Sequence, residues 1–298
     1  MEFMADYPDD GACLEALWRS RYSPDGEHSW CPACEKIRTF KKYATTQQRQ
    51  SWTCTGCGHH LHPTAGTIFH KSSTSLHLWF YAMYLMVSTR CGISAKQLER
   101  ELGVTYKTAY RIGTLIRQEL MAQDEALMSG DVEADETYVG GKRRGDKRGR
   151  PGADSHKVAV FGMVQRKGQV MAVTVPNVRK ATLLPHVEKR VLPKSTVYTD
   201  ELKSYDSLAT KGYAHRRVQH SEAVYVSGDS HTNTIEGFWS LVKRGIGGVY
   251  HSVRADHLQG YLNEYVWRYN TRDGERAQFD LLLLRASLGR VRGLGQLP

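Results

Sequence analysis

Apolar residues recur at helical spacing in much of the first half of the chain and at strand spacing in parts of the second half. Residues 73–88 (STSLHLWFYAMYLMVS) have the apolar density of a buried helix. Residues 92–120 predict two shorter helices, because Ser94 and Thr105 suit N-caps and Gly103 interrupts the pattern between them. Two short helices around a glycine-containing turn are typical of a helix-turn-helix.

From residue 131 onward the pattern alternates between strands and helices. After a first strand-like run (DVEADETYVGG), β-branched runs at 156–165 and 169–176 flank a short turn and predict a hairpin. The remaining predicted elements are a helix at 180–193, a strand ending at Asp200, a strand within 213–226, and helices beginning near 233 and 255. This is the element order of a ribonuclease H-like fold. We therefore expect an α/β domain with a mixed five-stranded sheet.

One of these helices, within residues 230–248 (SHTNTIEGFWSLVKRGIGG), carries a polar stripe. Asn233, Glu236, Ser240 and Lys243 fall close together at helical spacing, whereas the apolar residues turn toward a core. The plainest structural interpretation makes Asn233 the N-cap and Glu236 its partner in a capping box. A functional interpretation requires partners for this stripe elsewhere in the chain.

Four of the six cysteines form two CxxC pairs whose inner members, Cys34 and Cys54, are separated by 19 residues. This spacing matches a zinc site with four thiolate ligands. Disulfides are the structural alternative, but the chain shows no secretory signal, and a reducing compartment disfavours them. We predict a zinc ribbon whose structural Zn²⁺ is bound by Cys31, Cys34, Cys54 and Cys57. Cys13 and Cys91 are expected in the core.

The predicted ribbon also carries a mixture of basic and aromatic residues: Lys36, Arg38, Lys41, Lys42 and Arg49 are interleaved with Phe40, Tyr43 and Trp52. This composition suits a surface that contacts DNA or RNA, although a protein-binding ribbon would look much the same. Because so small a module buries little, the metal is expected to supply its folding energy.

The net charge favours a polyanionic partner, since 41 basic against 31 acidic residues give +10 at pH 7. Six of the basic residues lie in a Gly- and Pro-containing segment: Lys142, Arg143, Arg144, Lys147, Arg148 and Arg150. That segment is either a solvated hairpin tip or a loop that contacts phosphates. Near the start of the second helix of the predicted helix-turn-helix, the candidate DNA-binding residues are Tyr106, Lys107, Thr108 and Arg111. Many helical hairpins nevertheless bind nothing.

Three acidic residues occur where the predicted fold would bring them together. Asp135 lies in the first strand, Asp200 ends the fourth strand beside it, and Glu236 lies on the helix packed behind both. Carboxylates held close together repel and raise one another's pKa, so they are costly to assemble without cations. Mg²⁺ prefers oxygen ligands, and a pair of such ions can stabilise the entering and leaving oxygens of a phosphoryl transfer.

The chain resembles the DDE transposases of bacterial insertion sequences, in the group with an N-terminal zinc ribbon and an integrase-like catalytic domain. The segments that carry the resemblance are EADETYVGGK, VYTDELKSY, HTNTIEGFWSLVKRGIGGVYH and YLNEYVWRYNTR. The resemblance extends from Cys31 to about Arg272. Asp200 and Glu236 are separated by 35 residues, a spacing that is typical of retroviral-integrase-like enzymes.

The resemblance implies a role for each acidic position. Asp135 and Asp200 would bind Mg²⁺ or Mn²⁺, and Glu236 would be the third acidic member. Some relatives use an asparagine in that third role, and Asn233 is the matching residue here. Lys243, and with it the adjacent Arg244, would contact DNA phosphate near the cut. Two nearby acids, Glu136 and Asp229, are expected to lie outside the ligand set.

The resulting hypothesis is a transposase that binds the terminal inverted repeats of its element, cleaves a strand at each end and transfers it to target DNA. The predicted domains are an N-terminal region with the ribbon (1–68), a helix-turn-helix region (69–128), a ribonuclease H-like domain (129–275) and a C-terminal tail (276–298). We expect DNA partners, a homodimer or higher homo-oligomer, no membrane association, and a cytoplasmic, nucleoid-associated location in bacteria. The alternative is a DNA-binding regulator whose ribonuclease H-like domain is inactive.

Overall fold

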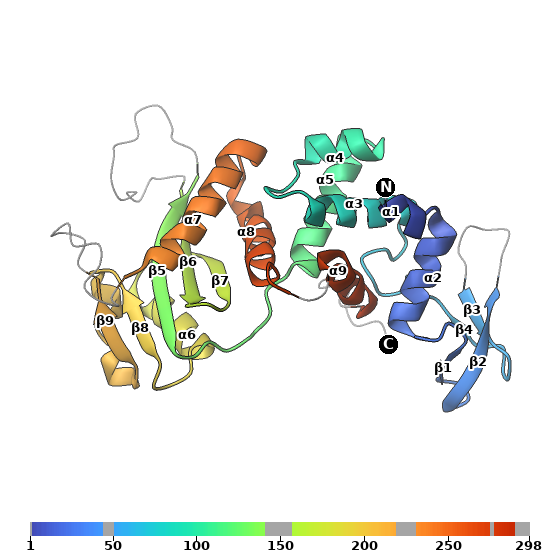
Figure 1. The fold of residues 1–298 in the computed structure, drawn as a ribbon, viewed down its shortest axis with the longest axis horizontal. Helices are drawn as coiled ribbons and strands as arrows, with labels where there is room; N and C mark the ends of the chain where they lie inside the picture. Colours follow the sequence, from blue (N-terminus) through green and yellow to red (C-terminus); the bar gives the residue numbers. More distant parts are fainter. Residues whose placement is uncertain (1, 44–50, 141–156, 219–230, 275–276, 290–298) are drawn as a thin grey trace. The chain divides into compact units, whose positions relative to one another are not determined.

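The computed structural model divides into two compact units (Figure 1). It describes residues 2–43, 51–140, 157–218, 231–274 and 277–289. Unit 1 comprises Met1–Leu120 with Gly274–Pro298, and unit 2 comprises Met121–Asp273. This division differs from the predicted domains, because the ribbon, the helical region and the C-terminal residues all fall in unit 1.

Unit 1 combines a small antiparallel sheet with six α-helices among its described residues. The strands, in sheet order, are β1 (His28–Cys31), β2 (Lys36–Tyr43), β3 (Ser51–Cys54) and β4 (His60–Leu61). The helices are α1 (Glu2–Asp6), α2 (Asp10–Arg21), α3 (Leu76–Ser88), α4 (Ala95–Leu102), α5 (Tyr106–Leu115) and α9 (Gln278–Ser287).

The predicted pair of short helices is present as α4 and α5. Ser94 caps α4 by accepting a hydrogen bond from the Gln97 N–H, and Thr105 caps α5 by accepting one from the Thr108 N–H. Gly103 ends α4 in the left-handed region at φ 63°, a conformation that glycine adopts without steric cost. The sequence therefore predicted both caps and the turn between them correctly.

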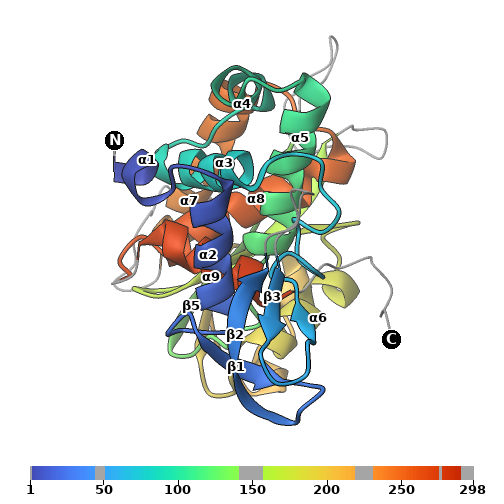
Figure 2. The same cartoon turned by 90° about the vertical axis from the view of Figure 1, so that its right-hand side faces the viewer.

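Helix α2 lies beside the strands of the ribbon (Figure 2), and the two share a core. The rings of Trp18 and Trp52 stack with centroids 4.7 Å apart, and Phe40 packs against Trp18. All three side chains are buried, so Phe40 and Trp52 are unavailable for the nucleic-acid contact that the sequence suggested. The ribbon therefore does not bury these rings by itself, because α2 supplies the other half of the core.

The C-terminal segment is helical, which differs from the predicted tail. Helix α9 packs on α2 and α3, and Phe279 contacts the rings of Phe3, Tyr7 and Phe80. Four apolar residues on one face of α9 are buried: Phe279, Leu282, Leu283 and Ala286. Their spacing of i, i+3, i+4 and i+7 is that of an amphipathic helix.

Unit 2 is built on a mixed five-stranded sheet in the order β7-β6-β5-β8-β9, which confirms the predicted sheet. Strands β5, β6 and β7 form an antiparallel meander, and β8 and β9 continue the sheet in parallel with β5. The strands are β5 (Asp131–Val139), β6 (Val158–Gln165), β7 (Val170–Val175), β8 (Thr196–Thr199) and β9 (Ala214–Arg217), and the helices are α6 (Lys180–Arg190), α7 (Asn233–Gly245) and α8 (Ala255–Asn270).

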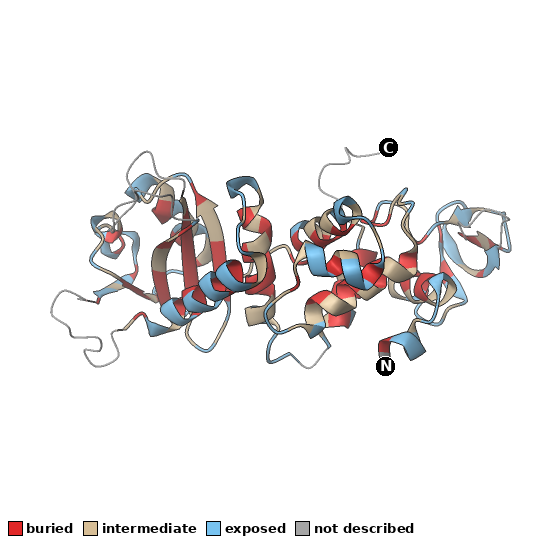
Figure 3. Ribbon diagram, turned by 90° about the horizontal axis from the view of Figure 1, so that it is seen from above, coloured by how far each residue is buried: buried red, intermediate tan, exposed pale blue. Residues whose placement is uncertain are grey.

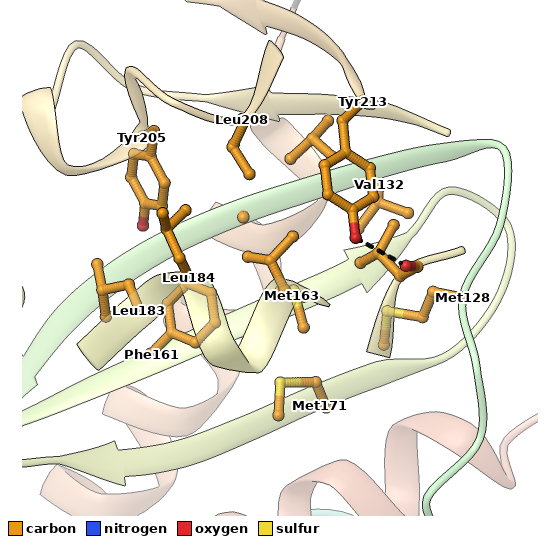
Figure 4. Packing of buried hydrophobic residues seen from close by; sticks show 14 of the residues in the cluster. Met128, Val132, Phe161, Met163, Met171, Leu183, Leu184, Tyr205, Leu208 and Tyr213 are labelled. Atoms are coloured by element: carbon orange, nitrogen blue, oxygen red, sulfur yellow. Dashed lines mark hydrogen bonds between the residues drawn. The ribbon is translucent and has the colours of Figure 1, made fainter. Parts of the chain in front are cut away.

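Two hydrophobic cores cover the two faces of this sheet, and its central strands are buried (Figure 3). One core joins the sheet to α6 and to the segment after β8, where the Tyr213 hydroxyl donates to the Val191 carbonyl (Figure 4). The other joins it to α7 and α8 through residues such as Phe238, Trp239 and Leu262. Consequently α7, which carries the polar stripe, is fixed directly against the sheet.

No helix in the described part of the chain is both long enough and apolar enough to cross a membrane.

Candidate active site

Asp135 on β5 and Asp200, which directly follows the parallel strand β8, lie beside each other. The pairing of β5 with β8 ends at Glu133 and Tyr198, so the same register continued by two residues brings Asp135 beside Asp200. Oxygens of the Asp135, Asp200 and Glu136 carboxylates lie within 4.8 Å of one another. The predicted neighbourhood of Asp135 and Asp200 is therefore present, and the third acid that completes the cluster is Glu136.

The inclusion of Glu136 differs from the sequence prediction, which placed this residue outside the ligand set. Adjacent residues of a strand point to opposite faces of the sheet, so the sequence pattern alone places Glu136 and Asp135 on different faces. Asp200 follows the last residue of β8, and an oxygen of its carboxylate lies within reach of both acids. The closeness of these three carboxylates is therefore visible only in the folded structure, at the end of β8.

A tryptophan on α7 orients Asp135. The Trp239 indole Nε1 donates to Asp135 Oδ2 at 3.0 Å. Gly162 of β6, which pairs with Asp135, makes room for this ring, since a Cβ at residue 162 would lie 2.5 Å from two indole carbons. Gly162 therefore allows Trp239 to reach Asp135 and hold its carboxylate.

The electrostatics of Asp135 are those of a crowded carboxylate. Burial and the charges of Asp200 and Glu236 raise the pKa of Asp135 to about 6, although hydrogen bonds from the Glu136 N–H and Trp239 act to lower it. A cation between the carboxylates would offset both the burial and the repulsion. Carboxylate oxygens are the donors that Mg²⁺ and Mn²⁺ prefer, so this donor set fits a divalent ion.

The other two acids of the cluster are also held by hydrogen bonds. The Leu202 N–H donates to Asp200 Oδ1 at 3.0 Å, and the Tyr205 hydroxyl donates to Glu136 Oε2 at 2.9 Å. Burial and the Glu136 charge keep the pKa of Tyr205 well above its usual value, so this hydroxyl remains a donor at neutral pH. Each of the three carboxylates therefore has a defined orientation before any metal arrives.

Glu236 and Asn233 lie on the exposed face of α7 together with Ser240 and Lys243. The polar stripe is therefore real, but the capping-box interpretation is wrong. Thr232 is the N-cap residue, and its hydroxyl donates to Glu236 Oε1 at 2.9 Å. Glu236 is outside the 4.8 Å cluster, although its charge contributes to the raised pKa of Asp135.

The first turn of α7 is capped from β5 instead. The backbone N–H groups of Thr234 and Ile235 donate to Glu133 Oε2 at 2.9 and 3.0 Å. Glu133 is fully buried, and sequence reasoning missed it because a cap from a distant strand leaves no local signature. The available signal was the position of Glu133 two residues before Asp135 in a predicted strand, which places both side chains on the same face.

The candidate DNA-binding side chains are mostly at the surface. Tyr106, Lys107 and Arg111 on α5 are exposed, and Thr108 is half-buried beside its Thr105 cap. Arg111 also contacts the Thr74 hydroxyl at 3.5 Å within unit 1. On α7, both basic candidates are exposed: Lys243 and Arg244. The acid Asp229 lies outside the described residues. So do the remaining basic candidates: Lys142, Arg143, Arg144, Lys147, Arg148 and Arg150.

The two CxxC pairs come together in unit 1 as a cluster of four thiols. Their sulfur atoms all lie within 4.8 Å, with Cys31 and Cys57 3.6 Å apart and Cys34 and Cys54 3.9 Å apart. Four thiolates about 2.3 Å from a tetrahedral zinc ion are separated by about 3.8 Å, so the geometry fits zinc. Of the other cysteines, Cys13 is buried as predicted, whereas Cys91 is exposed, contrary to the prediction.

Comparisons with known proteins agree with this arrangement of residues. Residues 127–270, which span the acidic cluster and α7, match the ISXO2-like transposase domain. An uncharacterized transposase-like protein of Haemophilus influenzae is 36% identical over 124 residues, which cover 41% of this chain and 98% of that protein. An uncharacterized protein in transposable element ISH50 of Halobacterium salinarum is 29% identical over 255 residues, covering 80% of this chain and 84% of that protein.

Solved structures with some likeness to the chain include the Mos1 strand transfer complex and the mariner Mos1 paired end complex with Mg. Their TM-scores are both 0.28, with 12% and 13% sequence identity. The matches cover 71% and 69% of this chain and 78% and 77% of the Mos1 chains. TM-scores this low carry no argument about the fold or the function of the chain.

Proposed function

The chain belongs to the insertion-sequence DDE transposases that carry an ISXO2-like transposase domain, and we propose that it cuts and joins DNA at the ends of its own mobile element. The observation that carries the proposal is the cluster of Asp135, Asp200 and Glu136, whose carboxylate oxygens lie within 4.8 Å of one another. The raised pKa of Asp135 supports the proposal, because a cation would offset the burial and the repulsion that raise it. The order of strands in unit 2 supports a ribonuclease H-like catalytic domain.

The proposed reaction consists of two phosphoryl transfers in one site. In the first, a water oxygen attacks the phosphorus at the element end and the P–O3′ bond breaks, which leaves a 3′-hydroxyl and a 5′-phosphate. In the second, that 3′-hydroxyl attacks a phosphorus of target DNA and breaks its P–O3′ bond. Each step forms one P–O bond and breaks another, so one set of residues can perform both.

Asp135 and Asp200 would hold the divalent ion, and Trp239 and the Leu202 N–H would keep their oxygens oriented. When bound, Mg²⁺ or Mn²⁺ would neutralise the carboxylates and part of the charge on the scissile phosphate. We propose Glu236 as a further ligand, because a carboxylate binds Mg²⁺ more strongly than an amide does. Asn233, on the same exposed face of α7, is the alternative in that role.

DNA binding is proposed for both units. In unit 1, Tyr106, Lys107, Thr108 and Arg111 would contact the terminal repeats through α5. In unit 2, Lys243 and Arg244 would contact phosphates near the cut, and the six basic residues of segment 141–152 would add further phosphate contacts. Two element ends must reach one target, so we propose that a dimer or larger assembly acts on DNA.

The four cysteines are proposed to bind one structural Zn²⁺ per chain. Burial raises the pKa of Cys54, but the Gly56 and Cys57 N–H groups lower it to about 7, which favours the thiolate that zinc requires. The core shared with α2 stabilises the same ribbon, so zinc and apolar packing would act together.

The experiment that tests the proposal is a cleavage and joining assay on labelled DNA that carries an element end. We expect both products when Mg²⁺ is added to magnesium-free protein that retains its zinc, and neither product from Asp135→Asn or Asp200→Asn. Tight DNA binding without either product, at any Mg²⁺ concentration, would contradict the proposal and leave a DNA-binding protein without catalysis.

A further inference from the structure

Glu133 is a buried carboxylate that the reaction described above does not use. It lies in β5 two residues before Asp135, so both side chains point to the face of the sheet that α7 covers. Its side chain is 0% exposed. A carboxylate in this environment is costly unless it is fully paired, so its partners show what it holds in place.

The first set of partners is on α7. Glu133 Oε2 accepts from the backbone N–H groups of Thr234 and Ile235, and Oε1 accepts from the Thr234 hydroxyl at 3.0 Å. Among the described residues, the N-cap Thr232 makes no side-chain capping bond of its own. A negative charge at this position also interacts favourably with the helix dipole. The start of α7 is thus fixed to β5 by Glu133.

The second set of partners reaches β8 through Arg166. Arg166 Nε donates to Glu133 Oε1 at 2.9 Å, and the guanidinium lies 4.1 Å from the centroid of the Tyr198 ring. Arg166 also donates to the His231 carbonyl at 2.8 Å, just before α7. Tyr198 precedes Asp200 by two residues. One ion pair therefore connects the three elements that carry Asp135, Asp200 and Glu236.

From these contacts we infer that Glu133 is a positioning residue, which with Arg166 sets α7 against β5 and β8 so that Glu236 can join Asp135 and Asp200 around a divalent ion. The inference rests on the proposed function of that cluster. It differs from a purely stabilising role, because it requires Glu133 to act on the metal site through Glu236.

The test is the dissociation constant for Mn²⁺ of the full-length protein, measured by calorimetric titration after zinc has been incorporated. Glu133→Gln keeps the volume and one acceptor oxygen but removes the charge that faces Arg166. We expect it to weaken Mn²⁺ binding about ten-fold, a typical effect of losing a residue that supports metal ligands. Glu236→Gln should weaken binding to a similar degree, and the double variant less than about two-fold further.

Glu264→Gln is the matched control. Glu264 on α8 is also 0% exposed, and it pairs with Arg268 at 2.8 Å and with the Tyr250 hydroxyl at 2.9 Å. This variant removes a buried charge of the same kind in the same unit, on a helix that carries none of the three clustered acids. It should lose stability but keep the Mn²⁺ affinity of the wild-type protein.

A milder variant covers the case in which Glu133→Gln does not fold. Thr234→Val removes only the hydroxyl bond to Glu133 and should weaken Mn²⁺ binding about three-fold, in the range expected for one neutral hydrogen bond. Faster hydrogen exchange of the Thr234 and Ile235 amides in the magnesium-free variants should accompany the loss.

Three results would overturn the inference. They are an unchanged Mn²⁺ affinity in the folded Glu133 and Thr234 variants, an equal loss in Glu264→Gln, or a Glu133→Gln effect that is just as large in the Glu236→Gln background. Failure of the proposed function looks different, because the wild-type protein itself would then bind no Mn²⁺ at the acidic cluster.

Discussion

At the scale of single residues, Asp135 is a carboxylate whose environment raises its pKa well above that of a surface carboxylate. Its pKa of about 6 results from burial and from the charges of Asp200 and Glu236. Because the folded state holds the proton more tightly than the unfolded state, Asp135 destabilises the metal-free fold above pH 6, and this destabilisation disappears as the pH falls toward 4.

Asp135→Asn is therefore expected to stabilise unit 2 at pH 7.5 without magnesium, by up to about 3 kcal/mol for a shift of roughly two pH units. The amide oxygen can still accept from Trp239. The measurement is the free energy of unfolding in urea, in magnesium-free buffer, with hydrogen exchange of the β6 amides as the probe of unit 2. The gain should shrink toward pH 4, and the exposed Asp256→Asn should change little. A less stable Asp135→Asn protein at pH 7.5 would contradict this explanation of the pKa.

Gly162 gives a second prediction at the residue scale. The Cβ of Gly162→Ala would lie 2.5 Å from the Trp239 ring, so the indole must move and its bond to Asp135 is lost. We expect DNA cleavage to fall about 10-fold or more, with a stability loss of about 1–3 kcal/mol.

The control for Gly162 is Gly237, where a Cβ would meet no atom within 4 Å. Gly237→Ala lies within α7 and should raise the free energy of unfolding by about 1 kcal/mol, because alanine has the higher helix propensity. Wild-type cleavage by Gly162→Ala would show that Trp239 does not orient Asp135.

At the scale of elements, the ribbon has two sources of stability, the thiol cluster and the core shared with α2. Cys31→Ser should abolish the binding of one zinc ion per chain and weaken DNA binding, while leaving Mn²⁺ binding by unit 2 unchanged. Zinc content by atomic absorption and Mn²⁺ titration measure the two effects separately. Cys91→Ser, an exposed cysteine outside the cluster, is the control and should keep its zinc. Full zinc content in Cys31→Ser would rule out the four-thiolate site.

Helix α5 gives the prediction for DNA recognition. Lys107 is exposed near its start, so Lys107→Ala should weaken binding to all sequences alike and reduce the slope of log K against log salt by about one. The measurement is fluorescence anisotropy over a salt series. Lys189→Ala removes a cation that is already paired with Glu125 and should have a smaller effect. Identical salt slopes for wild type and Lys107→Ala would exclude a phosphate contact by this residue.

Several elements could be predicted from the sequence because their signals are local. Ser94 and Thr105 were identified as caps from residue type alone, and the order of strands and helices along unit 2 followed from the change between strand and helix periods. The cap of α7 could not be found in this way, because Glu133 is 101 residues from Thr234 in sequence. The closeness of the Glu136 and Asp200 carboxylates could not be found either, because strand alternation says nothing about the end of a neighbouring strand.

At the scale of the whole molecule, the chain leaves unit 1 at Leu120, forms unit 2, and returns to unit 1 with α9. Phe279, Leu282, Leu283 and Ala286 have the spacing of an amphipathic helix, but the sequence prediction treated residues 276–298 only as a tail. The sequence pattern could have predicted α9, whereas its packing against α2 and α3 could be found only from the structure.

The central claim is that Asp135 and Asp200 form the metal centre with which this transposase acts on DNA. The most direct measurement is the location of Mn²⁺ by anomalous scattering from crystals of the zinc-loaded protein. We predict a manganese peak in contact with the Asp135 and Asp200 carboxylates and, as an internal control, a zinc peak within the four-cysteine cluster. A zinc peak at the four cysteines, with no manganese peak at the acidic cluster in millimolar Mn²⁺, would contradict the account.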